Sequence, residues 1–159
     1  METSHLTARE LLALHAQIAD QLIARGVTRS YNNPTGDLAE LLFCKAFGWT
    51  RADKSKSHVD AIGDGIRYQI KGRRITRVNK SRQLGVLREL DGGHFDFLAG
   101  VLFTEDYGIQ RAAIIPREVA MSLARFVKRT NSHRFLLQDS VWDASGVRDV
   151  TAELSAVSL

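Results

Sequence analysis

Cysteine and proline are scarce in this chain of 159 residues, which contains one cysteine and two prolines. A single cysteine cannot form an internal disulfide, so we expect the hydrophobic core alone to hold the fold together. The five histidines are scattered along the sequence, which does not support a zinc site built from Cys and His. The sequence also lacks a long apolar run and the pattern of a secretory signal, so we expect no membrane segment and a cytoplasmic location.

Positive charge is concentrated in one part of the chain. The net charge is only +4, but residues 51–88 hold eleven basic and three acidic side chains, a local charge of +8. The rest of the chain has eleven basic and fifteen acidic residues and is therefore negative. This segregation indicates a polyanionic partner, with nucleic acid as the main candidate. A solvated basic loop with no partner is the alternative interpretation.

The first half of the sequence predicts two helices and a hairpin. Thr7 and Glu10 form a capping box before an apolar repeat, which predicts a helix over about 7–25. Asn33 and Pro34 are typical of a helix start, and the apolar residues that follow predict a second, largely buried helix ending before Gly48. An Asp-Gly turn at 64–65 then predicts a hairpin of two short strands.

The second half alternates between the two kinds of element. We expect a short helix over 84–90, a strand over 95–103 covered on both faces, a strand over 109–115, an amphipathic helix over 117–129 and a last strand over 135–138. Strands that alternate with helices indicate an α/β fold with a central mixed β-sheet flanked by helices. The length and composition favour a single domain spanning residues 1–159.

Four polar residues stand out against this background. Glu40 lies on the buried second helix, and Asp60 stands at the start of the hairpin. Gln69 and Lys71 are two residues apart in the next strand, so their side chains share one face. Oxygen ligands beside a lysine are what metal-assisted hydrolysis of a phosphodiester requires.

Each of these residues also has a purely structural interpretation. Asp60 could cap the hairpin turn, as Asp often does at strand ends. Glu40 could form a structural ion pair with Lys45 or Arg67, because a buried carboxylate needs a partner. Lys71 could be an exposed lysine that protects a sheet edge from aggregation.

At these positions the sequence resembles the PD-(D/E)xK nuclease superfamily, the restriction-endonuclease-like fold. Glu40 matches the helix acid, Asp60 the first motif position, and 69–71 (Gln-Ile-Lys) the second. Val59 replaces the proline of the motif, and Gln69 replaces the acid, giving a Q-x-K variant. The resemblance covers residues 33–103. It implies an αβββαβ core with an N-terminal helix and C-terminal strand-helix-strand additions, and it requires one more short strand near 49–51.

The resemblance implies a Mg²⁺-dependent or Mn²⁺-dependent endodeoxyribonuclease. The catalytic residues would be Glu40, Asp60, Gln69 and Lys71. The metal ligands would be Glu40, Asp60, Gln69 and the main-chain carbonyl of Ile70, with Lys71 positioning the attacking water. Phosphate contacts would come from basic residues that follow the motif, namely Arg73, Arg74, Arg77, Lys80 and Arg82. Because one small domain leaves no room for a separate recognition domain, a homodimer or a partner protein would serve duplex cutting.

A second interpretation comes from a different class of protein. Gln69 contributes no charge to a metal, which favours a nuclease-fold module that binds nucleic acid or protein without catalysis. DNA is the expected nucleic acid, but RNA stays open because phosphate contacts do not distinguish the sugar.

Overall fold

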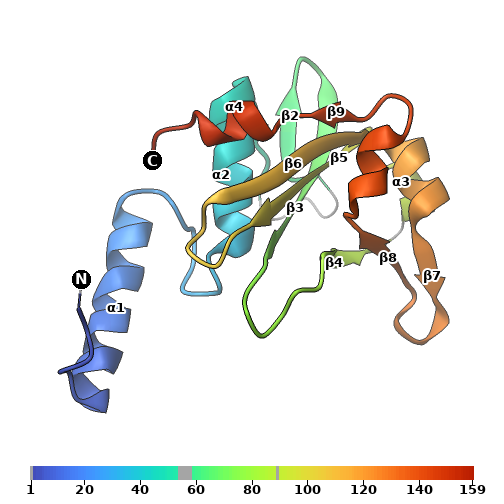
Figure 1. Cartoon of the computed structure of the whole chain (residues 1–159). Coiled ribbons are helices and arrows are strands. Elements are labelled where there is room, and N and C mark those ends of the chain that lie inside the picture. Colours follow the sequence, from blue (N-terminus) through green and yellow to red (C-terminus); the bar gives the residue numbers. More distant parts are fainter. Residues whose placement is uncertain (1, 54–58, 89) are drawn as a thin grey trace.

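A mixed six-stranded sheet lies at the centre of the molecule (Figure 1). The computed structural model describes residues 2–53, 59–88 and 90–159. Lys54 and Lys56, part of the basic segment, lie outside these residues. The parallel pair β3 and β5 has antiparallel neighbours on both sides. In spatial order the strands are β1 (Thr50–Arg51), β2 (Ala61–Gly63), β3 (Ile66–Arg74), β5 (Phe97–Phe103), β6 (Ile109–Pro116) and β9 (Arg148–Asp149).

Different elements cover the two faces of this sheet. Helices α2 (Thr35–Phe47) and α4 (Thr151–Ser155) pack on one face. The other face is covered by α3 (Arg117–Leu123) and a second, three-stranded sheet. That sheet has the order β4 (Gln83–Leu87), β8 (Ser132–Leu136) and β7 (Arg125–Val127). The expected α/β class and mixed central sheet are therefore confirmed.

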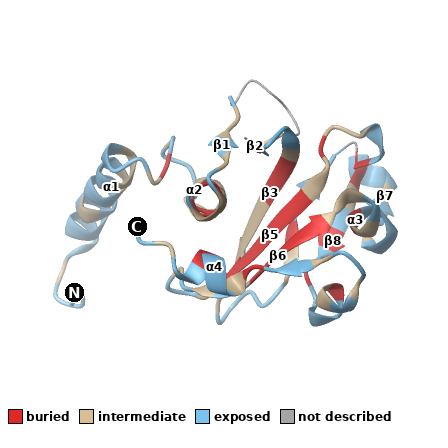
Figure 2. Ribbon diagram, turned by 90° about the horizontal axis from the view of Figure 1, so that it is seen from above, coloured by how far each residue is buried: buried red, intermediate tan, exposed pale blue. Residues whose placement is uncertain are grey.

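Helix α1 (Ala8–Ala24) stands apart from these layers (Figure 2). The expected capping box is present, because Glu10 N–H donates to Thr7 Oγ1 and Thr7 N–H donates to Glu10 Oε2. The helix has no buried residue. Within the described part of the chain, no helix combines the length and the hydropathy needed to cross a membrane.

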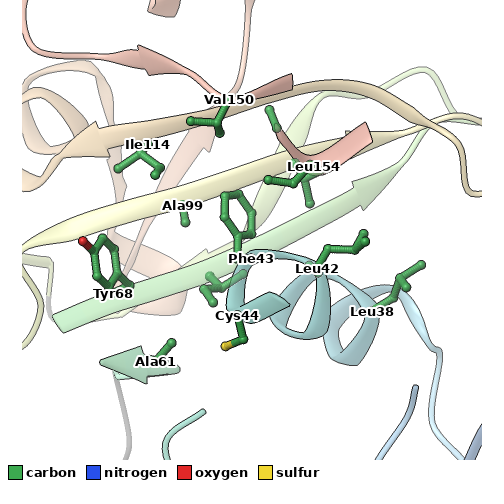
Figure 3. Packing of buried hydrophobic residues seen from close by; sticks show 14 of the residues in the cluster. Leu38, Leu42, Phe43, Cys44, Ala61, Tyr68, Ala99, Ile114, Val150 and Leu154 are labelled. Atoms are coloured by element: carbon green, nitrogen blue, oxygen red, sulfur yellow. The ribbon is translucent and has the colours of Figure 1, made fainter. Parts of the chain in front are cut away.

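Helix α2 supplies the core of the first layer (Figure 3). Thr35 N–H donates to Asn33 Oδ1 at 3.0 Å, which satisfies one of the free amides at the helix start. The buried side chains of α2 point onto the sheet, and they are Leu38, Ala39, Leu42, Phe43 and Cys44. The predicted buried helix is thus confirmed.

Strand β3 comes unusually close to this helix at Gly72. A Cβ placed on Gly72 would lie 3.1 Å from Thr35 O, 3.1 Å from Ala39 Cβ and 3.0 Å from the ring of Phe103. Such distances are shorter than ordinary van der Waals contact. A larger residue at this position would therefore push α2 away from the sheet.

The hairpin formed by β2 and β3 also agrees with the prediction. Asp64 and Gly65 both have positive φ, 50° and 78°, as a tight Asp-Gly hairpin turn requires. Tyr68 and Ile70 belong to the core layer beneath α2. By strand alternation, Gln69 lies on the opposite face. The short strand expected near 49–51 is present as β1.

The helix expected over 84–90 is wrong. Residues 83–87 form strand β4, followed by a short 3-10 turn at Leu90–Gly92. The apolar spacing of this segment fits a helix locally. Leu84 and Leu87 are instead buried through pairing with β8, a strand distant in sequence. The second helix of the expected αβββαβ order is consequently absent from the described part of this connection.

Two further boundaries differ from expectation for the same reason. The helix expected over 117–129 ends at Leu123, because 125–127 pairs with β8 as strand β7. The strand expected over 135–138 is observed at Ser132–Leu136. Long-range pairing in the second sheet overrides the local helical pattern.

Replacing Phe43 by alanine tests the packing of α2. Phe43 is fully buried, so Phe43→Ala should lower the free energy of unfolding by about 3–5 kcal/mol. Phe126→Ala, at a side chain that is 54% exposed, is the matched control and should cost less than about 1 kcal/mol. Urea unfolding followed by circular dichroism measures both. Equal losses would contradict the packing of α2 on the sheet.

Candidate functional site

A polar pocket of about 290 Å³ lies between α2 and the residues that precede β2. Two acids singled out from the sequence, Glu40 and Asp60, line it together. Asp37, one turn before Glu40 on the helix, Asp53, after β1, and Arg29, from the loop after α1, complete its charged lining. The structure therefore places Glu40 and Asp60 in the same pocket, and it adds Arg29, a cation that the sequence did not indicate.

Glu40 is held by two arginines. Arg29 Nη2 donates to Glu40 Oε2, and Arg51 Nε lies 3.3 Å from the same oxygen. Both arginines also contact Asp37: Arg29 N–H donates to Asp37 Oδ2 at 2.8 Å, and Arg51 Nη2 donates to the Asp37 carbonyl at 2.7 Å. These residues form a mutually paired cluster at the wall of the pocket.

The expectation that Glu40 needs a cationic partner is confirmed, but the partners expected from the sequence are wrong. Lys45 Nζ donates to the carbonyl of Ser158 at 3.3 Å. Arg67 pairs with Asp96 at 2.8 Å on the opposite face of the sheet. Arg29 lies in a loop without periodicity, so no sequence pattern predicts where its side chain reaches.

Burial governs the charge of Glu40. Its side chain is 15% exposed, and the loss of hydration raises the pKa of the carboxyl above its ordinary value. The nearby negative charges of Asp60 and Asp37 raise it further. Arg29 and Arg51 pull the pKa down but do not offset the burial. Glu40 therefore titrates at a higher pH than a free glutamate.

Asp60 has a clear structural role at the edge of β3. Its Oδ2 accepts a hydrogen bond of 2.7 Å from the N–H of Ile70. Strand β2 begins only at Ala61, so no strand residue stands opposite Ile70 on that side. The carboxylate takes the place of a strand carbonyl there, which differs from the turn cap considered from the sequence. Among the described residues, Asp60 Oδ1 has no hydrogen-bond partner.

Gln69 and Lys71 flank Ile70 and lie on the face opposite α2. Gln69 is 5% exposed, and its Oε1 is buried without a hydrogen-bond partner among the described residues. A buried acceptor in that condition costs about 1–3 kcal/mol. Lys71 is half-buried and passes beside Gly85 of β4, so it is not the fully exposed edge lysine considered from the sequence.

The four motif residues therefore do not line one cavity. Glu40 and Asp60 share the pocket on the α2 side of the sheet. Gln69 and Lys71 occupy the other face, and Asp60 connects to them across the sheet edge through the Ile70 amide. The aspartate is thus the point where the two halves of the arrangement meet.

The donors around Ile70 fit the divalent cation that the resemblance implies. Asp60 Oδ1 and Gln69 Oε1, which have no partner among the described residues, are hard ligands of the kind Mg²⁺ and Mn²⁺ prefer. The Ile70 carbonyl points to the same sheet edge as its N–H. In residues 2–53, 59–88 and 90–159 no three acidic, His or Cys side chains gather closely enough to hold a metal. Glu40 is paired with two guanidinium groups and does not fit the role of a ligand.

Two of the expected phosphate contacts are free to bind a partner. Arg77 and Lys80 lie in the loop between β3 and β4, and both are exposed. Neither has a hydrogen bond or an ion pair within the part of the chain that the structure describes. Their charges are fully available to an anion.

The other three basic residues help to hold the fold. Arg73 Nε donates to the carbonyl of Ser81 at 3.1 Å, and Arg82 Nη1 donates to Asp139 Oδ1 at 2.8 Å. Arg74 Nε donates to a main-chain carbonyl in the turn between β5 and β6 at 2.7 Å. They remain positive, but their guanidinium groups are partly committed.

Comparisons with known proteins give this site no outside reference. No protein-family model and no curated protein matches the chain. The geometry of the side chains is therefore the basis for any functional proposal.

The charge of Glu40 gives a testable pH dependence. Because the pKa of the Glu40 carboxyl is raised in the folded state, its protonation stabilises the fold at low pH. This contribution is lost as the pH rises above 4.5 and through the folded-state pKa. Wild type should therefore lose unfolding free energy relative to Glu40→Gln between about pH 4 and 7. Urea unfolding across this range measures the difference, with Glu153→Gln as a charge control. A relative gain by wild type would show that the arginines outweigh burial.

Proposed function

We propose that this chain is a metal-dependent nuclease that hydrolyses DNA phosphodiester bonds. The hydrogen bond from the Ile70 amide to Asp60 carries the proposal, because it brings the aspartate level with the Gln-Ile-Lys segment. A carboxylate then lies at Ile70, which is flanked in sequence by a lysine and by an amide oxygen that has no partner among the described residues. This combination supports phosphodiester chemistry better than a structural role, which would leave Gln69 Oε1 unexplained.

In this proposal Asp60, Gln69 and the Ile70 carbonyl hold Mg²⁺ or Mn²⁺. The bound cation would supply a water of lowered pKa and neutralise charge on the phosphate. Lys71 would hold the attacking water, or the phosphate itself, through its ammonium group. Gln69 is neutral, so the site would bind the cation more weakly than one with a second acid.

Glu40 takes a different role from the one implied by the resemblance. Paired with Arg29 and Arg51, it fixes two guanidinium groups at the wall of the pocket that Asp60 also lines. The pocket lining contains four acids and one arginine, so its net charge is negative and favours a cation. We propose that the cluster of Glu40 with the two arginines orients Asp60.

A restriction-endonuclease-like core is part of the proposal. The order of α2, β1, β2, β3 and β5 follows the expected αβββ arrangement with a later parallel strand. The departure is the connection from β3 to β5, where β4 and a 3-10 turn stand in place of a helix. The motif residues lie outside this connection, although Lys71 passes beside Gly85 of β4.

A catalytically inactive module that binds nucleic acid is the second candidate. The observation that favours it is the commitment of Glu40 to two arginines, together with a neutral Gln69. Asp60 and Asp53 would then be the carboxylates of the pocket lining that stand outside the arginine cluster. Such a module would bind DNA through the loop between β3 and β4 and cleave nothing.

Nicking of supercoiled plasmid separates these candidates. With Mg²⁺ or Mn²⁺ the wild type should nick the plasmid, whereas Asp60→Asn and Lys71→Met should lower the rate by about 100-fold or more. Asp60→Asn keeps an acceptor for the Ile70 amide and removes the charge. Lys45→Met, on the outer side of α2, is the control for loss of a lysine and should nick normally.

The absence of nicking under all metal conditions, combined with metal-independent binding of the plasmid, would favour the inactive module. Nicking that survives both motif substitutions would contradict the assigned site. Competition with RNA in the same assay tests the choice of DNA.

The salt dependence of binding tests the basic loop. Arg77→Ala and Lys80→Ala should each weaken DNA binding and reduce the slope of log K against log salt concentration by about 0.9 per phosphate contact on a duplex. Fluorescence anisotropy with a labelled duplex at several salt concentrations measures the slope. Arg9→Ala on α1 is the control. An unchanged slope in both loop variants would mean that DNA binds elsewhere.

A further inference from the structure

Helix α1 presents an apolar surface that the rest of the chain covers only in part, where Ile18 and Leu22 face the body of the molecule. It has 17 residues, and none of them is buried. In both Figure 1 and Figure 2 it projects from the body beside the loop that leads into α2. One side-chain hydrogen bond, from Tyr31 to Asp20 at 2.9 Å, ties the helix to that loop among the described residues. A helix of this length is marginal in water without tertiary packing.

The apolar side chains of α1 form a stripe along one side. Leu11, Leu14, Ile18 and Leu22 follow a 3-4-4 spacing, which keeps them on one face. Leu11 and Ile18 are 42% and 44% exposed. A shallow groove of about 340 Å³ runs along this side and is lined by α1 residues, including Leu14, Ile18 and Arg25. This is the surface that a second helix would fill.

The charges beside the stripe favour one particular occupant. At about 100° per residue, Glu10 and Arg25 lie about 60° apart on the same side of the stripe's centre, near its opposite ends, Arg25 being the C-cap residue after α1. In an antiparallel pair of identical helices, equivalent flanks face each other, so Glu10 of one copy stands beside Arg25 of the other. The apolar residues meet in the same register, Leu11 beside Leu22 and Leu14 beside Ile18. A parallel pair would instead turn opposite flanks toward each other and keep Glu10 and Arg25 at opposite ends, so the two could not pair.

We propose that the chain forms a symmetric homodimer through antiparallel pairing of α1 with α1 of a second copy. The apolar stripes meet along the dimer axis, and two Glu10–Arg25 pairs close its ends. This proposal does not depend on the nuclease function. Nicking and dimer formation can therefore succeed or fail separately.

Charge reversal tests both the surface and its orientation. Sedimentation equilibrium of the wild type should show a dimer, and Ile18→Glu should be monomeric at the same concentrations. Glu10→Arg or Arg25→Glu alone should weaken the dimer by about tenfold, because each sets like charges together at both ends. An equimolar mixture of the two variants should restore it as a heterodimer, in which both ends again pair opposite charges.

The mixture also separates charge pairing from loss of the capping box. Glu10→Arg breaks the box with Thr7 in the mixture as much as alone, so recovery on mixing must come from the paired charges. Glu10→Gln, which preserves the box, is a further control. A monomeric wild type at all concentrations overturns the proposal. A dimer that persists in Ile18→Glu would also overturn it. So would charge variants whose dimer remains weakened when the two are mixed.

Discussion

The hydrogen bond between the Ile70 amide and Asp60 determines how the site is arranged. Strand β2 is short, and among the described residues no strand pairs with this edge of β3 beyond Tyr68. The aspartate carboxylate pairs with that edge in place of a strand carbonyl. It thereby lies at the sheet edge, between the pocket on the α2 side and the strand that bears Gln69 and Lys71. The α2 side contributes a charged pocket, and the opposite side contributes a buried amide and an ammonium.

The charges around the pocket form one connected group. Four acids line it together with Arg29, namely Asp37, Glu40, Asp53 and Asp60. Because Arg29 and Arg51 each contact both Glu40 and Asp37, these four residues behave as one unit. The lining keeps a net negative charge, which favours a cation over an anion.

The sequence predicted the parts of the fold that local chemistry decides. The capping box at Thr7, the buried α2 and the Asp-Gly hairpin all depend on neighbouring residues, and all are confirmed. The segment 83–87 was misread because its apolar spacing suits a helix as well as a strand. Only its pairing with β8, about fifty residues later, selects the strand.

The candidate site shows the same division. Strand alternation correctly placed Gln69 and Lys71 on one face. The need of Glu40 for a cation was also evident from its apolar surroundings. Arg29 could not be identified, because the position of its loop at the pocket depends on the tertiary arrangement of α1 and α2 and not on a local sequence pattern.

The close approach at Gly72 has a consequence for how this protein can vary. With hydrogen in place of a side chain, the backbone of β3 sits directly against the first turn of α2. The distance between α2, which bears Glu40, and β3, which bears Lys71, thus depends on the absence of a side chain at Gly72. Substitution of Gly72 by a larger residue would move the two layers apart and change both halves of the site at once, although residue 72 contributes no polar side chain of its own.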